Sequence, residues 1–131
     1  MKKWEGKNNI KYRAYLFAIN VIKTLDETKN KEISFSIIIK QLLRNSTSIG
    51  ANIIEAQAGS TKKDFINFLN HSLKSSNETK FWLSLLKDTN KIKEHQVNEL
   101  IKENIEISKI LGSIIINSKI TITRLFLILH F

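Results

Sequence analysis

The chain has 131 residues, with 21 Lys plus Arg against 12 Asp plus Glu, a net charge of +9 and a pI near 9.8. It has no cysteine, which excludes disulfides, thiolate metal centres and thiol catalysis. No proline and only four glycines favour long helices over a turn-rich β fold. The length fits one domain, residues 1–131. Because no segment reaches ~18 apolar residues and no apolar core follows the charged start, we expect a cytoplasmic chain without signal peptide or membrane span.

The first two predicted helices cover about residues 10–27 and 34–58. In both segments apolar residues recur every three or four positions, which places them on one helical stripe. The second is too long for a strand. Small residues within it, Ser46, Gly50 and Ala51, predict close approach of a neighbouring helix. Gly59 follows the last periodic residue and is typical of a helix C-terminus, where φ is often positive.

Two further helices are predicted at about residues 61–89 and 96–117. Thr61 and Asp64 form a variant of the capping box, so the third helix should begin there. Its core stripe is polar in the middle, at Ser72, Ser76 and Thr79, which predicts a less apolar interhelical contact.

The apolar tail, residues 118–131, fits three structures. Ile120 to Thr123 alternate like a strand, whereas Leu125 to Leu129 are wholly apolar. The tail could extend the fourth helix, add a strand or dock on a partner.

Four amphipathic helices with short connections predict an all-α, up-down-up-down four-helix bundle. Two of the helices carry apolar residues beyond their core stripe, and surplus apolar surface usually marks an interface. We therefore expect a homo-oligomer whose interface includes Tyr15, Ile19, Phe81, Trp82 and Leu85.

Catalytic patterns are sparse. The sequence contains no Glu-x-x-His pair, no His-Glu-x-x-His motif and no phosphate-binding glycine loop. Glu99, Glu103 and Glu106 share one helical face, but Lys102 and Lys109 lie close by, so a solvated charged face is favoured over a metal site. We expect no enzyme, cofactor or metal. An enzyme built around Glu55 and Glu78 remains a third interpretation.

Basic residues follow the third predicted helix. Lys80, Lys87 and Lys91 are spaced by seven and four residues, and Lys62 lies five turns before Lys80. Lys63 and Lys74 form a second line. Such a stripe can follow a phosphate backbone, and lysine contacts predict weakly specific binding of nucleic acid. The alternative is a lysine-rich solvated surface.

One stretch, Gln41-Leu-Leu-Arg-Asn-Ser-Thr-Ser-Ile-Gly-Ala-Asn-Ile-Ile-Glu55, resembles a known signature. It is similar to Gln-Leu-x-Arg-Ala-x-x-Ser-Ile-Pro-Ala-Asn-Ile-Ala-Glu-Gly of the four-helix bundle proteins encoded in intervening sequences of bacterial 23S rRNA genes. The similarity continues through Ser60-Thr-Lys-Lys-Asp-Phe-Ile-Asn-Phe-Leu69 and reaches Ser75 and Glu78, which match the Gly-Ser-Leu-x-Glu segment of the family. The motif residues carried over are Arg44, Ser48, Asn52, Glu55, Ser75 and Glu78.

The resemblance implies a homo-oligomer, a pentameric ring, with no enzymatic activity. A related branch, the accessory variability determinant of diversity-generating retroelements, implies a basic protein serving a reverse transcriptase and its template RNA. The chain departs from the pattern where Gly50 replaces Pro and Ala56 replaces Gly. Gly59 and Ser60 stand where the family often has arginines, which weakens the case for RNA binding through that loop.

Two functions therefore remain open beside the enzyme. The first is a basic accessory protein that binds RNA, DNA or a nucleoprotein partner. The second is a protein–protein interaction scaffold without nucleic-acid binding, which should keep its partner at high salt, whereas phosphate binding should not.

Overall fold

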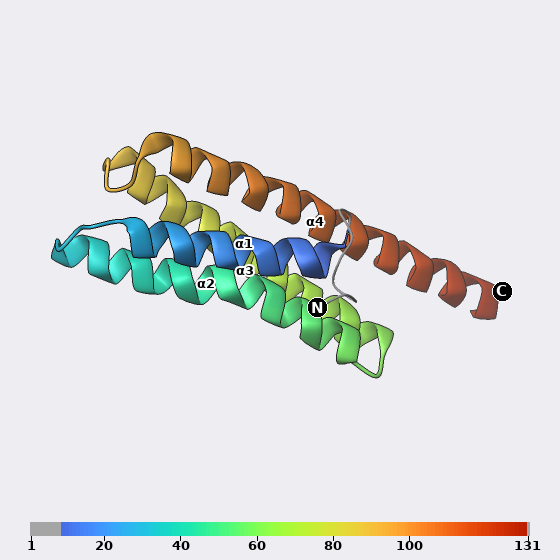
Figure 1. Cartoon of the computed structure of the whole chain (residues 1–131). Helices are drawn as coiled ribbons and strands as arrows, with labels where there is room; N and C mark the ends of the chain where they lie inside the picture. Colours follow the sequence, from blue (N-terminus) through green and yellow to red (C-terminus); the bar gives the residue numbers. More distant parts are fainter. Residues whose placement is uncertain (1–8, 131) are drawn as a thin grey trace.

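A computed structural model describes residues 9–130, except for the side chains of residues 122–126 and 129–130. It contains four helices and, within the described residues, no strand: α1 (Ile10–Glu27), α2 (Ile33–Ala58), α3 (Lys62–Asp88) and α4 (Glu94–His130). The first eight residues, where we expect no signal peptide, and Phe131 lie outside the described range. The predicted all-α class is confirmed, and the arrangement is consistent with a four-helix bundle (Figure 1).

The helix ends follow local side-chain chemistry. Asn9 caps α1, because its Oδ1 accepts a hydrogen bond from the Lys11 amide at 2.9 Å. Thr61 Oγ1 accepts one from the Asp64 amide at 3.0 Å, as the predicted cap requires. Gly59 ends α2 as expected, but its φ is −63°, not positive. A Cβ there would lie 3.3 Å from the Asp64 Cβ, so lack of space favours glycine at this position.

The turn between α3 and α4 closes with a positive φ at a non-glycine residue, Asn90 (φ 55°). The Asn90 amide donates to the Lys87 carbonyl, and the Lys91 amide donates to the Leu86 carbonyl, both at 3.0 Å. These two bonds define a Schellman motif, and asparagine tolerates its left-handed position better than most residues.

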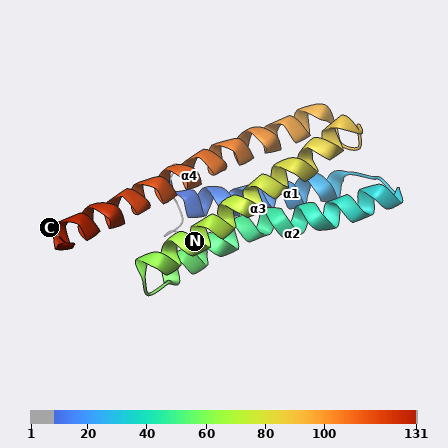
Figure 2. The same cartoon turned by 180° about the vertical axis from the view of Figure 1, so that it is seen from behind.

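Each helix packs against two neighbours, α1 and α3 lying on opposite corners. α2 contacts α1 and α3, and α4 contacts α3 and α1. Accordingly, α1 lies in front of α3 in Figure 1 and behind it in Figure 2. The predicted close approach occurs between α1 and α2, because a Cβ on Gly50 would lie 3.5 Å from the Ala14 Cβ. Ser46 is also buried there, whereas Ala51 is exposed.

The core is built largely from the predicted stripes. The largest fully buried apolar side chains are Phe17, Leu42, Ile49, Ile53, Leu69, Leu83, Leu86, Ile107 and Leu111. Along α4 the apolar spacing predicts a core face that includes Ile101 and Ile105, but both are only half-buried, whereas Asn104 and Ile107 are buried.

The polar middle of α3 is satisfied by partners inside the bundle. Ser72 Oγ donates to the Ile49 carbonyl of α2 at 2.7 Å. Ser76 Oγ donates to Asn104 Oδ1 at 2.8 Å, and Asn104 Nδ2 donates to the Ser76 carbonyl at 2.9 Å. As predicted, the middle of α3 makes polar contacts, and these link the helix to both α2 and α4.

The apolar tail after residue 117 belongs to the fourth helix. α4 continues to His130, so the first of the three structures considered for the tail is the one formed. At ~1.5 Å per residue the helix is about 55 Å long, and its last turns project past the other helices (Figures 1 and 2). Exposed apolar side chains follow this extension, including Ile128 at 72%. Over the described residues, no helix is long and apolar enough to cross a membrane.

Candidate nucleic-acid interface

Five of the six motif residues line one shallow groove of about 390 Å³ between α2 and α3. Its walls are formed by Arg44, Asn45, Ser48 and Asn52 from α2 and Phe68, His71, Lys74, Ser75 and Glu78 from α3. The sixth motif residue, Glu55, is exposed on α2 and does not line the groove. Hence Glu55 and Glu78, the two residues of the possible enzyme site, do not share this groove.

Local bonds explain the small polar residues of the groove. Ser48 Oγ donates to the Arg44 carbonyl at 2.6 Å, and Asn52 Nδ2 donates to the Ser48 carbonyl at 2.9 Å. Both bonds return to the preceding helical turn, a common arrangement for such residues within a helix. They leave the Asn52 Oδ1 as an acceptor.

The charged side chains of this groove are not compensated. Arg44, His71 and Lys74 are exposed, and Glu78 is the single acidic residue among the lining residues. No ion pair involves Arg44, Lys74 or Glu78 within the part of the chain that the structure describes. The Phe68 and His71 rings lie with centroids 6.2 Å apart, so the groove also has an aromatic wall.

The lysines predicted to contact phosphate are placed differently from one another. Lys62, Lys63, Lys74 and Lys80 are exposed along α3, and Lys87 is half-buried. Lys91 lies in the α3–α4 loop, where its Nζ donates to Glu32 Oε2 at 2.8 Å and its side chain is only 11% exposed. That hydrogen bond lowers the pKa of the Glu32 carboxyl. Lys91 is therefore already paired and is a poor phosphate ligand.

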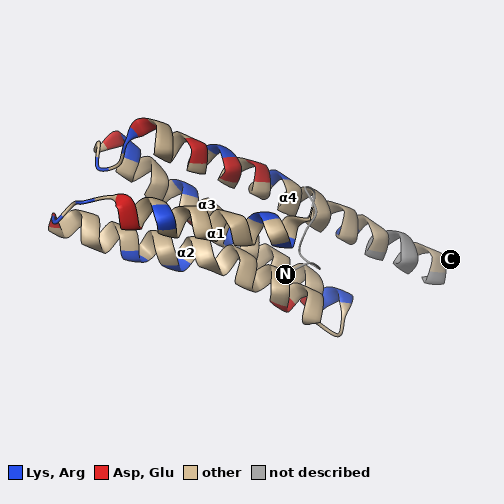
Figure 3. Cartoon of the chain, in the orientation of Figure 1, with Lys and Arg blue, Asp and Glu red and all other residues tan. Residues whose placement is uncertain are grey.

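Acidic residues gather on a different helix. Residues 94–109 of α4 carry four glutamates and two lysines, and Figure 3 shows these acidic positions following α4. The basic character of the chain is therefore unevenly distributed over its surface.

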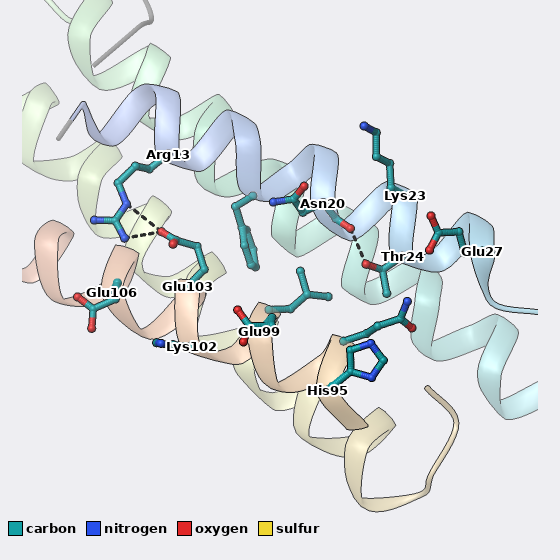
Figure 4. Close-up of a pocket in the computed structure, with 13 residues that line it drawn as sticks. Arg13, Asn20, Lys23, Thr24, Glu27, His95, Glu99, Lys102, Glu103 and Glu106 are labelled. Atoms are coloured by element: carbon teal, nitrogen blue, oxygen red, sulfur yellow. Dashed lines mark hydrogen bonds and ion pairs between the residues drawn. The ribbon is translucent and has the colours of Figure 1, made fainter. Parts of the chain in front are cut away.

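A larger groove, of about 570 Å³, lies between α1 and α4 and was not predicted from the sequence. Figure 4 shows the pair that bridges it, Arg13 of α1 and Glu103 of α4. Arg13 Nε donates to Glu103 Oε1 at 2.8 Å. Glu99 and Glu106 also line this groove, yet no cluster of described residues could hold a metal ion. The sequence did not predict this groove, because residue spacing within α1 and within α4 does not determine which faces of the two helices meet.

The residues predicted to form one oligomer interface lie on two separate surfaces. Tyr15 and Ile19 belong to α1, whereas Phe81, Trp82 and Leu85 belong to α3, the diagonal helix. Tyr15 is 39% exposed and Phe81 is 57% exposed. The Phe81 and Trp82 rings pack edge to face with centroids 5.0 Å apart. The chain thus presents two apolar surfaces, one on each side of the bundle.

These features define an all-α protein with four antiparallel helices and a polar groove built from motif residues. The sequence pattern of the 23S rRNA-intervening sequence protein family matches residues 6–113, and the chain belongs to this family. A solved relative is the crystal structure of a protein of unknown function from the S23 ribosomal protein family of Bacteroides thetaiotaomicron. It is 39% identical, with a TM-score of 0.72, and the match covers 81% of this chain and 97% of that one. No curated protein matches the chain.

Proposed function

We propose that the chain is a non-enzymatic, cytoplasmic accessory protein that binds RNA through its basic surface. The observation that carries this proposal is the row of exposed lysines on α3, Lys62, Lys63, Lys74 and Lys80, in a chain of net charge +9. Lysine side chains contact phosphate as point charges, so binding should be weakly specific and should weaken steeply with salt. Family membership is consistent with this role but does not identify the RNA.

We also propose that the protein acts as a homo-oligomer, a pentameric ring. Two different apolar surfaces on opposite corners of the bundle suit a head-to-tail contact, in which one surface of a subunit covers the other surface of the next. Repetition of such a contact closes a ring when the rotation allows it. A ring would also multiply the positive charge presented to RNA. A nucleoprotein such as a reverse transcriptase with its template is a partner of suitable chemistry.

The first test is light scattering coupled to size exclusion, with and without a short structured RNA, at low and high salt. A particle of about five subunits that binds RNA only at low salt is expected. An oligomer that ignores RNA at every salt concentration would overturn RNA binding and favour the protein–protein scaffold. The exposed Phe81 beside Trp82 is the surface on which a partner should then be sought.

The triple charge reversal Lys62→Glu, Lys80→Glu and Lys87→Glu should weaken RNA binding by roughly tenfold or more, because three phosphate contacts become repulsive. Lys91 is kept, since its replacement would break the pair with Glu32. The matched control is Lys23→Glu, Lys29→Glu and Lys102→Glu, which changes the charge equally at exposed lysines that have no ion pair among the described residues. Equal loss in the two triple variants would mean that net charge, not this surface, controls binding.

A further inference from the structure

Arg44 and Lys74, which line the α2–α3 groove, have no ion pair among the described residues. By contrast, Arg13 is paired with Glu103, and Lys91 is paired with Glu32. Arg44 of α2 and Lys74 of α3 line the two walls of one groove. The two cations outnumber the single carboxylate of the groove, Glu78, so the groove keeps a net positive charge that suits an anionic ligand.

The donor set suits a phosphodiester group. The guanidinium of Arg44 can present two parallel N–H groups to phosphate oxygens, and Lys74 adds a point charge from the opposite wall. Ser75 lines the same groove, and the structure gives its hydroxyl no hydrogen bond within the described residues. The Ser48 hydroxyl, in contrast, is already committed to the Arg44 carbonyl.

The groove also has a surface for a base. Phe68 lines the groove, is half-buried against the core, and its ring is tilted by 56° to that of His71 at a centroid distance of 6.2 Å. Aromatic rings next to cations form the usual platform on which unpaired bases stack. The volume of about 390 Å³ suits a single small ligand group. A base paired within a duplex could not reach these rings.

We propose that the α2–α3 groove binds one unpaired nucleotide of RNA, with its phosphodiester on Arg44 and Lys74 and its base against Phe68 and His71. The inference rests on the proposed RNA-binding function and names the site and the form of RNA. The larger α1–α4 groove is a worse candidate, because its carboxylates outnumber its cations and Arg13 is already paired.

The test is a fluorescence anisotropy titration with a labelled single-stranded oligouridine of about ten nucleotides. Arg44→Ala and Lys74→Ala should each weaken binding about tenfold and lower the slope of log affinity against log salt by about one phosphate contact. The matched controls are Lys23→Ala and Lys102→Ala, which remove the same charge from the other groove and should change affinity less than about twofold.

A third variant separates stacking from charge. Phe68→Leu should weaken binding about tenfold while leaving the salt slope unchanged, because no phosphate contact is removed. Helix content and the midpoint of thermal unfolding are measured for every variant, so that a folding defect is not scored as lost binding. A fully paired RNA duplex of the same length should compete poorly, and a duplex that competes as well as the single strand would overturn the proposal.

Failure of this inference is distinct from failure of the proposed function. If the wild-type protein binds no RNA at low salt, both are overturned. If it binds, and the three groove variants bind equally well while the Lys62, Lys80 and Lys87 triple variant does not, RNA binding stands and the groove proposal is overturned.

Discussion

Two adjacent residues of α4, Glu103 and Asn104, connect the helix to its two neighbours in opposite ways. Glu103 reaches across the α1–α4 groove to Arg13, and their side chains are 37% and 25% exposed. Asn104 is 1% exposed, and its side chain exchanges two hydrogen bonds with Ser76 of α3. One step along the helix therefore separates a solvated ion pair from a polar contact that no water reaches.

The difference in burial, not in charge, decides what each contact is worth. A partly exposed ion pair gains little, because water solvates both ions well when they are apart and salt screens their attraction. A buried amide that loses its partner has no water to replace it, so the full desolvation cost remains. The neutral pair should thus stabilise the bundle more than the charged pair.

The largest effect is expected at the buried contact. Asn104→Ala should lower the free energy of unfolding by about 1–3 kcal/mol, because it removes both side-chain hydrogen bonds to Ser76 and opens a small cavity, while Ser108 Oγ, 3.0 Å away, remains a partner of the Ser76 hydroxyl. Urea unfolding followed by circular dichroism measures this change. The control is Asn98→Ala, an exposed position on the same helix, which should stay within about 0.5 kcal/mol. A loss below about 1 kcal/mol at Asn104 would contradict the argument.

A smaller effect is expected at the exposed pair. Glu103→Gln should cost at most about 1 kcal/mol at low salt and less at high salt, since solvent and ions screen it. The same unfolding experiment, repeated at two salt concentrations, measures it. Glu99→Gln is the matched control, because Glu99 lines the same groove and has no ion pair among the described residues. If Glu103→Gln proved as costly as Asn104→Ala, burial would not be the deciding factor.

The sequence predicted the α3 side of the buried polar contact but not the α4 side. The polar positions of α3, Ser72, Ser76 and Thr79, are spaced as core residues, and all three are buried. Their partner Asn104 was missed because asparagine does not mark a core position by its hydrophobicity. Apolar periodicity along α4 therefore predicts Ile101 and Ile105 in the core, which are only half-buried, and omits Asn104. Where a core contact is polar, the spacing of apolar residues no longer identifies the buried face of the helix.

The candidate sites were also only partly predictable from the sequence. The motif residues of α2 and α3 were recognised one helix at a time, and the groove joins them because the two helices pack side by side. The pairing of Lys91 with Glu32 depends on how two loops meet at one end of the bundle, which no spacing along the chain encodes. The extension of α4 past residue 117 was left open because an apolar, β-branched segment suits a helix and a strand alike.

The smallest effect is expected at this loop-to-loop pair, and it should depend on pH. The hydrogen bond from Lys91, assisted by one from Asn30 and by the charge of Lys91, lowers the pKa of Glu32 below its ordinary value of 4.5. A lowered carboxyl pKa in the folded state stabilises the fold above the unfolded pKa, and that stabilisation is lost as the pH falls through the folded pKa.

Glu32→Gln should therefore reduce the thermal midpoint slightly at pH 7 and leave it unchanged at a pH well below 4.5. Thermal unfolding of both proteins over this pH range gives the difference, with Glu27→Gln as a control at an exposed carboxylate that has no ion pair within the described residues. A difference that grows as the pH falls would contradict the assigned pair. Because Glu32 is exposed, this effect should also be the most sensitive to salt, which would place it with Glu103 rather than with Asn104.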